Sequence, residues 1–449
     1  MNIRDVIDRS PMTRFQVMVV ALCLVMNVVE GFDILVMAFA ASGVAAEWHL
    51  TASQVGLLLS SGPIGMALGS ALVAPLADRI GRRPLTLACL AVATVGMFLS
   101  ALTTGGVQLG LCRVLTGIGV GGVIAGLPVI IAEYSSRRGR GTSTAFFAVG
   151  LPLGGVVGGT IAALVTAGYG WRATFLLGAV LSLVTVSAMA AVLPESIDYL
   201  AARRPAGALA RMNTILARMR IAPLDALPAP VDRAATGVGR NVLRGRNGIR
   251  SVLLWVAFFC LFAATYFAGS WTPRLLEQSG LSAQQGISGG ILLNAGGVVG
   301  VLIVAALALR VAVTKLAVAA LLLGAIAFGL MTMALGSLGA TMAAAVLVGL
   351  LVNANGALLY AVAPSLYPVS VRATAVGWAL AVGRVGAIVA PLVAGALVDA
   401  GWSGRGLFGL FAVPLAVAAA AVAGVTRLGA RRDATPELDQ QHLPPAVSA

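Results

Sequence analysis

The stretch Val28-Val-Glu-Gly-Phe-Asp-Ile-Leu-Val-Met-Ala38 places two carboxylates inside an apolar segment that runs from about residue 15 to residue 41. Such a segment can span a bilayer core of roughly 30 Å as a helix. Glu30 and Asp33 are three residues apart, so they lie on one helix face. A charge at membrane depth costs at least ~2.5–3.5 kcal/mol, so this face must point to protein or to a water-filled cavity. A proton or substrate site is favoured for the two acids, and a structural ion pair is the alternative.

The composition of the whole chain is that of a membrane protein. Of its 449 residues, 59% are hydrophobic and 10% are charged, and the mean hydropathy is +0.97. A soluble fold cannot hide that much apolar surface. Apolar segments long enough to cross a bilayer cover residues 15–41, 53–76, 84–103, 107–132, 142–167, 172–193, 250–273, 286–309, 314–334, 340–364, 372–398 and 405–426. The sequence therefore predicts an all-α integral membrane protein with twelve transmembrane helices.

The basic residues set the expected orientation. The net charge is +14, but all except five of the 30 Lys and Arg fall in segments that are cytoplasmic if the first helix enters from the cytoplasm. The exceptions are Arg113, Arg172, Arg274, Arg384 and Arg405. This positive-inside asymmetry predicts cytoplasmic termini and a multi-pass protein of the inner (plasma) membrane. The same asymmetry accounts for the net positive charge, because the basic residues orient the chain in the membrane. We therefore expect the lipid bilayer as its surroundings and no nucleic acid as a partner.

The segments divide the chain into two bundles. We predict an N-terminal six-helix bundle at 1–193, a cytoplasmic linker at 194–249, a C-terminal six-helix bundle at 250–426 and a disordered cytoplasmic tail at 427–449. Residues 201–220 of the linker are predicted to form a basic amphipathic helix. The loop before the fifth segment corresponds to the loop before the eleventh, with Arg140 matching Arg372. Two parallel repeats are typical of transporters whose substrate site lies between the halves.

The turn Asp78-Arg-Ile-Gly-Arg-Arg-Pro84 separates the second and third segments. Gly81 permits a tight turn, and Asp78 and the arginines can pair with one another and with neighbouring helix ends. We expect Glu133, at the cytoplasmic end of the fourth segment, to pair with Arg137, Arg138 or Arg140. A solvated basic turn is the alternative. The predicted gating residues are Asp78, Arg79, Gly81, Arg82, Arg83, Glu133, Arg140 and Arg372.

This turn and the stretch Arg113-Val-Leu-Thr-Gly-Ile-Gly-Val-Gly121 resemble signatures of the major facilitator superfamily, although Ala74 stands where the family usually has Gly. The resemblance implies the major facilitator fold. Arg113 lies ~9 Å from the outer end of its helix and Asp33 lies ~12 Å from the outer end of the first helix. The two are thus at a similar level, and we predict an ion pair between them, with Glu30 one turn deeper toward the cavity.

The motif Glu30-Gly-Phe-Asp33 is similar to the Asp-Gly-x-Asp signature of the aromatic acid:proton symporters, with Glu in place of the first Asp. Ser270-Trp-Thr-Pro273, Asn294-Ala-Gly-Gly-Val-Val-Gly300 and Gly383-Arg-Val-Gly386 also resemble that family. The resemblance covers nearly all twelve helices. It implies a proton-coupled symporter that imports an aromatic carboxylate such as 4-hydroxybenzoate or benzoate. Both histidines lie outside the predicted segments, so proton coupling is assigned to Asp33 and Glu30.

Arg384 lies ~20 Å along the eleventh helix, close to the bilayer midplane. The C-terminal half offers no obvious acid to pair with it, and a buried guanidinium without partners is costly. A substrate carboxylate would satisfy it through two parallel hydrogen bonds. Backbone carbonyls, Glu30 or Asp33 are the alternative partners. Other predicted substrate contacts are Tyr266, Trp378, Asn294 and Asn355, for which helix packing is the alternative.

Other functions fit the sequence less well. One alternative is an importer of an aliphatic dicarboxylate such as cis,cis-muconate. Drug/proton antiport is disfavoured because Gly155 stands where the corresponding motif has Pro. A non-transporting membrane sensor would need a larger signalling domain than the linker or tail. An enzyme is not expected, because the chain shows no catalytic constellation, no metal-ligand spacing and no cofactor motif. We expect the protein to act as a monomer on a small organic anion and protons.

Overall fold

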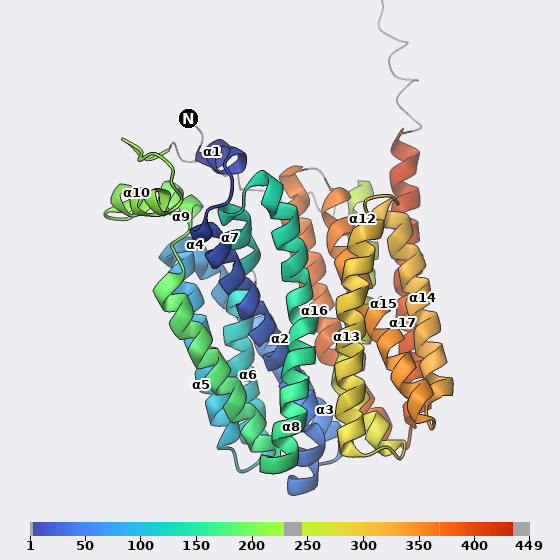
Figure 1. The fold of residues 1–449 in the computed structure, drawn as a ribbon. Helices are drawn as coiled ribbons and strands as arrows, with labels where there is room; N and C mark the ends of the chain where they lie inside the picture. The colour runs from blue at the N-terminus through green and yellow to red at the C-terminus, as the bar shows by residue number, and fades with distance from the viewer. Residues whose placement is uncertain (1–2, 125, 229–244, 368, 434–449) are drawn as a thin grey trace, which may run out of the picture.

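The structure is a computed structural model that describes residues 3–124, 126–228, 245–367 and 369–433. All regular elements in these ranges are helical, and none is a strand. In chain order they are α1 (Ile3–Arg9), α2 (Arg14–Trp48), α3 (Ala52–Leu68), a π-turn (Gly69–Val73), a 3-10 turn (Ala74–Leu76), α4 (Ala77–Ile80), α5 (Arg82–Ala101), α6 (Gly106–Ile124), α7 (Leu127–Tyr134), α8 (Arg137–Val192), α9 (Ile197–Arg203), α10 (Ala208–Arg218), α12 (Gly245–Gln278), α13 (Ala283–Leu307), α14 (Val313–Ala334), α15 (Leu338–Ser365), α16 (Val369–Asp399) and α17 (Gly404–Asp433). Figure 1 shows the long helices standing side by side in two groups.

Eleven described helical stretches are long and apolar enough to cross a membrane. One of them, α8, has 56 residues and is interrupted at Gly170, whose φ of 77° and ψ of 174° are not helical. Glycine adopts this positive φ without a steric penalty. The chain reverses direction there, so α8 consists of two arms, residues 137–169 and 171–192 (Figure 1). This break agrees with the boundary predicted between 167 and 172.

The starts of the long helices are encoded locally. Thr13 and Gln16 form a capping box at α2, in which the Thr13 N–H donates to Gln16 Oε1 at 2.9 Å and the Gln16 N–H donates to Thr13 Oγ1 at 3.4 Å. Thr51 and Gln54 repeat this arrangement at α3. Such boxes satisfy backbone donors that have no partner within the helix. They fix where these membrane helices begin.

Glycines allow helices within each half to pack closely. A Cβ at Gly31 would clash with the backbone carbonyl of Leu151 on α8, and one at Gly154 would clash with the carbonyl of Val28 on α2. In a membrane, such close backbone contact is a main source of helix association. Gly31 therefore brings α8 against the part of α2 that carries Glu30 and Asp33.

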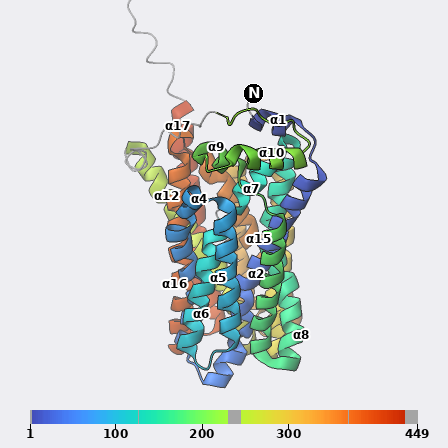
Figure 2. The same ribbon diagram turned by 90° about the vertical axis from the view of Figure 1, so that its left-hand side faces the viewer.

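The described ends of the chain lie on one face of the molecule, which we call the linker face because α9 and α10 also lie there (Figures 1 and 2). The helix predicted within residues 201–220 is shorter than expected. Arg204 (φ 49°) and Gly207 (φ 73°) separate α9 from α10. Met212, Ile215 and Leu216 form the buried side of α10. Linker residues 229–244 and tail residues 434–449 lie outside the described ranges.

The two halves meet through α3 and α16, α8 and α13, and α2 and α12. At the face opposite the linker face, the Asp399 carboxylate at the end of α16 accepts hydrogen bonds from the N–H groups of Ala52 (2.9 Å) and Ser53 (2.8 Å) at the start of α3. The Ser42 hydroxyl of α2 also donates to the Glu277 carboxylate of α12. These contacts hold the halves together at that face.

Candidate functional site

Glu30 and Asp33 lie in the interior of the N-terminal half. Their exposed fractions are 0% and 1%, and none of their four carboxylate oxygens has a hydrogen-bond partner among the described residues. Burying an ionised carboxylate without partners is costly. The free energy of the ionised form of either acid therefore depends strongly on whether a proton, a water molecule or a nearby cation is present. The sequence left open whether this face points to protein or to a cavity, and in this structure Glu30 is enclosed in the bundle.

Arg113 lies beside Asp33, as the helix levels predicted, but the contact differs from the expected ion pair. Its Nη2 donates to the backbone carbonyl of Asp33 at 2.5 Å, and its Nη1 donates to Met97 Sδ at 3.1 Å. The guanidinium carbon also lies 5.8 Å from the centre of the Phe175 ring. In this structure Arg113 is thus held by a neutral oxygen, a sulfur and a ring, while the Asp33 carboxylate has no hydrogen bond.

A small cavity adjoins this pair. It has a volume of about 10 Å³ and is lined by side chains of α2, α3 and α6, among them Asp33, Arg113 and Thr116. That volume is close to the minimum for one water molecule, which needs polar partners to be stable. The cavity provides such partners, so it gives water a place next to the Asp33 carboxylate.

Arg384 lies in the C-terminal half with two tyrosines from two other helices. The guanidinium on α16 is close enough to act electrostatically on the hydroxyls of Tyr266 on α12 and Tyr360 on α15. Arg384 is half-buried, and no described residue forms a hydrogen bond or ion pair with it. Tyr360 is 49% exposed, so protein does not fully enclose this group. Neither Glu30 nor Asp33 reaches Arg384 across the halves.

Aromatic rings continue from these tyrosines along α12. Phe262 lies 6.2 Å from Tyr266, and Phe258 lies 5.9 Å from both Phe262 and Tyr360, as distances between ring centres. We call Phe258, Phe262, Tyr266, Tyr360 and Arg384 the aromatic cluster. Phe258 and Phe262 were not predicted as site residues. The available signal was that Phe258, Phe262 and Tyr266 follow one another at intervals of four, because residues four apart share a helix face.

The other predicted substrate contacts lie outside the aromatic cluster. Trp378 stacks on Trp255 at 5.8 Å, ~9 Å along α16 from Arg384. Asn355 is fully buried and donates to the backbone carbonyl of Ala320 on α14 at 3.1 Å. Asn294 packs against Gly155 where α13 meets α8, so it lies between the halves. The roles of these three in substrate binding stay predictions.

Comparison with known proteins identifies the family. The family model of the Major Facilitator Superfamily matches residues 22–336. The chain belongs to the major facilitator superfamily. The gallate transporter of Pseudomonas putida is 29% identical over 429 residues, which are 94% of either chain. The 4-hydroxybenzoate transporter of Pseudomonas aeruginosa is 30% identical over 431 residues, 94% of this chain and 95% of that protein. These relatives confirm the predicted resemblance to aromatic acid transporters.

The fold agrees with this membership. The xylose transporter of Escherichia coli, in a partially occluded inward-open conformation, matches 91% of this chain and 97% of its own, with a TM-score of 0.72 and 15% sequence identity. The chain is therefore a multi-pass membrane transporter and not an enzyme. Identity this low indicates a shared fold and carries no information about the substrate.

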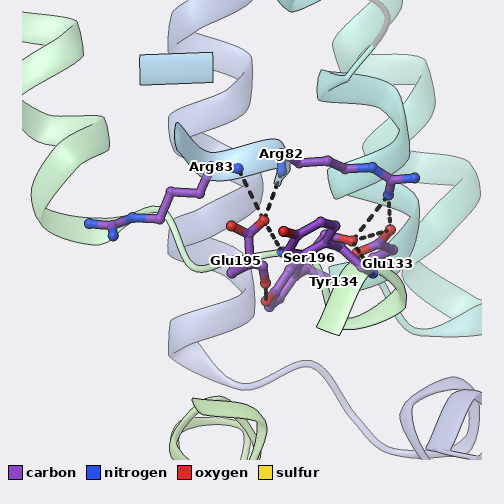
Figure 3. Close-up of polar contacts among 7 residues, drawn as sticks. Arg82, Arg83, Glu133, Tyr134, Glu195 and Ser196 are labelled. Atoms are coloured by element: carbon purple, nitrogen blue, oxygen red, sulfur yellow. Dashed lines mark hydrogen bonds and ion pairs between the residues drawn. The ribbon is translucent and has the colours of Figure 1, made fainter. Parts of the chain in front are cut away.

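Three of the predicted gating residues of this transporter, Arg82, Arg83 and Glu133, lie close together at the linker face (Figure 3). Arg82, at the start of α5, pairs with Glu133 on α7, and the Ser196 hydroxyl donates to Glu133 Oε1 at 3.0 Å. Glu133 had been expected to pair with Arg137, Arg138 or Arg140, and this prediction is wrong. The sequence neighbours lead into α8, where Arg140 pairs with Asp8 instead.

Glu195 also belongs to this region, although it was not among the predicted gating residues. Its Oε1 accepts hydrogen bonds from the N–H groups of Arg82 (2.9 Å), Arg83 (3.1 Å) and Ser196 (2.9 Å). A carboxylate is stabilised at a helix N-terminus, where backbone donors lack partners. Gly81 has a φ of 105°, and a Cβ there would clash with this carboxylate. Glu195 therefore ties the end of α8 to the turn at Gly81.

Asp78, Arg79 and Arg372 have their own contacts at the linker face. The backbone carbonyl of Asp78 accepts from Arg203 Nε at 2.8 Å, and that of Arg79 accepts from the Tyr199 hydroxyl at 3.4 Å. Arg372 donates to the carbonyl five residues before it at 3.4 Å, as Arg140 does at 3.3 Å. This shared contact supports the correspondence predicted between the two loops.

Changing Glu133 to Gln is expected to lower the free energy of unfolding by about 3–5 kcal/mol, because it leaves the buried Arg82 guanidinium without a counter-charge. Thermal unfolding of the purified transporter in detergent measures the effect. The control is Glu47→Gln, which removes the partner of Arg172 in a pair whose side chains are 41% and 39% exposed. An exposed pair contributes about 0–1 kcal/mol. Equal shifts for both variants would contradict the prediction.

Proposed function

We propose that this protein is a proton-coupled symporter that imports an aromatic carboxylate such as 4-hydroxybenzoate or benzoate. The observation that carries the proposal is the aromatic cluster, where a half-buried arginine without a hydrogen bond or ion pair to any described residue lies within electrostatic range of tyrosine hydroxyls from two other helices. A guanidinium binds a carboxylate through two parallel hydrogen bonds, and aromatic side chains pack against an aromatic ring. Relatives that carry gallate and 4-hydroxybenzoate support this substrate class.

In the same proposal the chain crosses the membrane twelve times as a monomer. The two arms of α8 are separate spans, and they join the ten other long helical stretches. The linker face, on which the described ends of the chain lie, is cytoplasmic, in agreement with the positive-inside rule. The bacterial relatives favour the plasma membrane. The Asp399 contacts close the outer face, so the structure corresponds to an inward-facing state.

Coupling rests on two charges, one in each half. In the outward-open state a proton binds Asp33 or Glu30, and the organic anion binds Arg384. Neutralising the charges in both halves removes the cost of enclosing them, and the halves then rock to the inward-facing state. The anion leaves to the cytoplasm and the proton follows. The unpartnered Asp33 carboxylate and the water-sized cavity beside it support this assignment.

The first experiment is uptake of radiolabelled 4-hydroxybenzoate into proteoliposomes under an inward proton gradient, with and without a protonophore. We expect accumulation that depends on the gradient and is abolished by the protonophore. Competition by unlabelled benzoate and by cis,cis-muconate compares an aromatic with an aliphatic acid. Tight, protein-loaded vesicles that take up none of these acids would refute the proposed substrate class and leave the family assignment intact.

A further inference from the structure

A second cavity, of about 570 Å³, lies between the two halves, where the first arm of α8 faces α13 and α15. It is at the linker face, because it includes Arg137 at the start of α8 (Figure 1). Arg137, Arg140 and Thr144 provide its polar wall, while the wall formed by α13, α14 and α15 consists of alanine, valine and leucine side chains such as Val304, Ala357 and Ala361. The volume is within the range of pockets that hold small molecules.

The two walls have opposite chemistry. Arg137, Gly141 and Thr144 share one face of α8, so the basic and hydroxyl groups form a single stripe. Of the described residues that line the cavity, none is acidic. A basic stripe facing small apolar side chains suits a molecule with an apolar ring on one side and an anionic group on the other. An aromatic carboxylate has this form.

The two arginines are not equivalent. Arg140 is engaged, since it pairs with Asp8 on α1 and donates to the backbone carbonyl of Ser135 at 3.3 Å. Arg137 is exposed and has no hydrogen bond or ion pair to any described residue. Arg137 is therefore the cation available to a ligand in this cavity.

The cavity and the aromatic cluster share a stretch of α15. Ala357 and Ala361 line it and flank Tyr360, which precedes Ala361 on α15 and belongs to the cluster around Arg384. We propose that this cavity is an exit vestibule that holds the aromatic carboxylate after it leaves Arg384, with Arg137 binding the carboxylate and the alanine and valine wall covering the ring. This inference rests on the proposed function, and it adds a second, weaker binding place on the cytoplasmic side.

The test compares the two faces of the transporter in inside-out and right-side-out membrane vesicles. We measure the concentration of radiolabelled 4-hydroxybenzoate that half-saturates entry from each face without a proton gradient. Arg137→Gln is expected to raise this concentration about tenfold at the linker face, as for the loss of one charge-assisted hydrogen bond. At the opposite face we expect less than a twofold change. Arg137→Lys should restore most of the affinity.

Arg138→Gln is the matched control, because Arg138 is also exposed but does not line the cavity. Arg138→Gln should leave the half-saturating concentration of 4-hydroxybenzoate unchanged at both faces. If Arg137→Gln keeps the wild-type value at the linker face, or if Arg138→Gln shifts that value equally, the vestibule is refuted while the proposed function stands. If wild-type vesicles admit no 4-hydroxybenzoate from either face, both proposals fall.

Discussion

Asn in place of Asp33 is expected to abolish accumulation of 4-hydroxybenzoate while leaving exchange across the membrane intact. The neutral amide has the shape of the protonated acid, so the protein can still enclose it and the halves can still rock. No proton then moves with the substrate. A gradient of about two pH units can drive about 100-fold accumulation when one proton accompanies each anion. The variant should reach only equal concentrations on the two sides.

Two assays on the same proteoliposomes separate coupling from movement. Uptake under a proton gradient should be lost in Asp33→Asn, whereas counterflow of labelled against unlabelled substrate should persist. Asp33→Glu, which keeps an ionisable group, should retain part of the accumulation. Glu30→Gln in the same assays tells whether the second carboxylate shares the role. Gradient-driven accumulation by Asp33→Asn would exclude Asp33 as the coupling residue.

Much of the fold could be predicted from the sequence because membrane helices are encoded locally. An apolar run of sufficient length must form a helix in lipid, where all backbone hydrogen bonds have to be internal. Thr51 and Gln54 fix the start of α3, one residue before the predicted segment. The predicted segments 142–167 and 172–193 likewise leave a gap at the observed break at Gly170. The end of α2 at Trp48, seven residues beyond the predicted segment, depends on tertiary contacts that hydropathy does not describe.

The ion pairs at the site were harder to predict, because they depend on how helices rotate against each other. The level of Arg113 relative to Asp33 follows from the rise per residue, and the structure places the two together. Rotation decides which oxygen the guanidinium reaches, and here it reaches the backbone carbonyl. For Glu133, sequence proximity pointed to the arginines that follow it. Its partner Arg82 is 51 residues earlier and becomes a neighbour only when α5 packs near α7.

The aromatic cluster illustrates the same limit. Arg384 was predicted from its depth in the membrane and from the lack of an acid near it in the C-terminal half. Tyr266 was predicted as an aromatic contact, but Phe258 and Phe262 were read only as apolar residues of the helix. Their role follows from the meeting of α12, α15 and α16 at one point. The spacing of the aromatic residues along α12 shows that they share one helix face. Only the packing of the helices shows that this face meets Arg384.

Arg384→Gln is expected to weaken equilibrium binding of 4-hydroxybenzoate by about 100-fold or more. Each hydrogen bond to a charged group contributes about 1.5–3 kcal/mol, and the guanidinium can make two with one carboxylate. Because no described residue pairs with Arg384, its removal leaves no internal acid without a partner, and the protein should stay folded. Arg384→Lys keeps the charge but loses the planar pair of donors, so we expect an intermediate loss of about tenfold.

Calorimetric measurement of binding to the purified transporter tests the role of Arg384 directly. The neutral analogue 4-hydroxybenzamide is measured in parallel with 4-hydroxybenzoate. The wild type should prefer the acid, and Arg384→Gln should bind both ligands alike, because only the acid uses the guanidinium. Arg310→Gln is the control, since it removes an exposed arginine from the loop between α13 and α14. An equal loss of both ligands would mean that Arg384 shapes the site without binding the carboxylate. Unchanged preference for the acid would place the anion elsewhere in the protein.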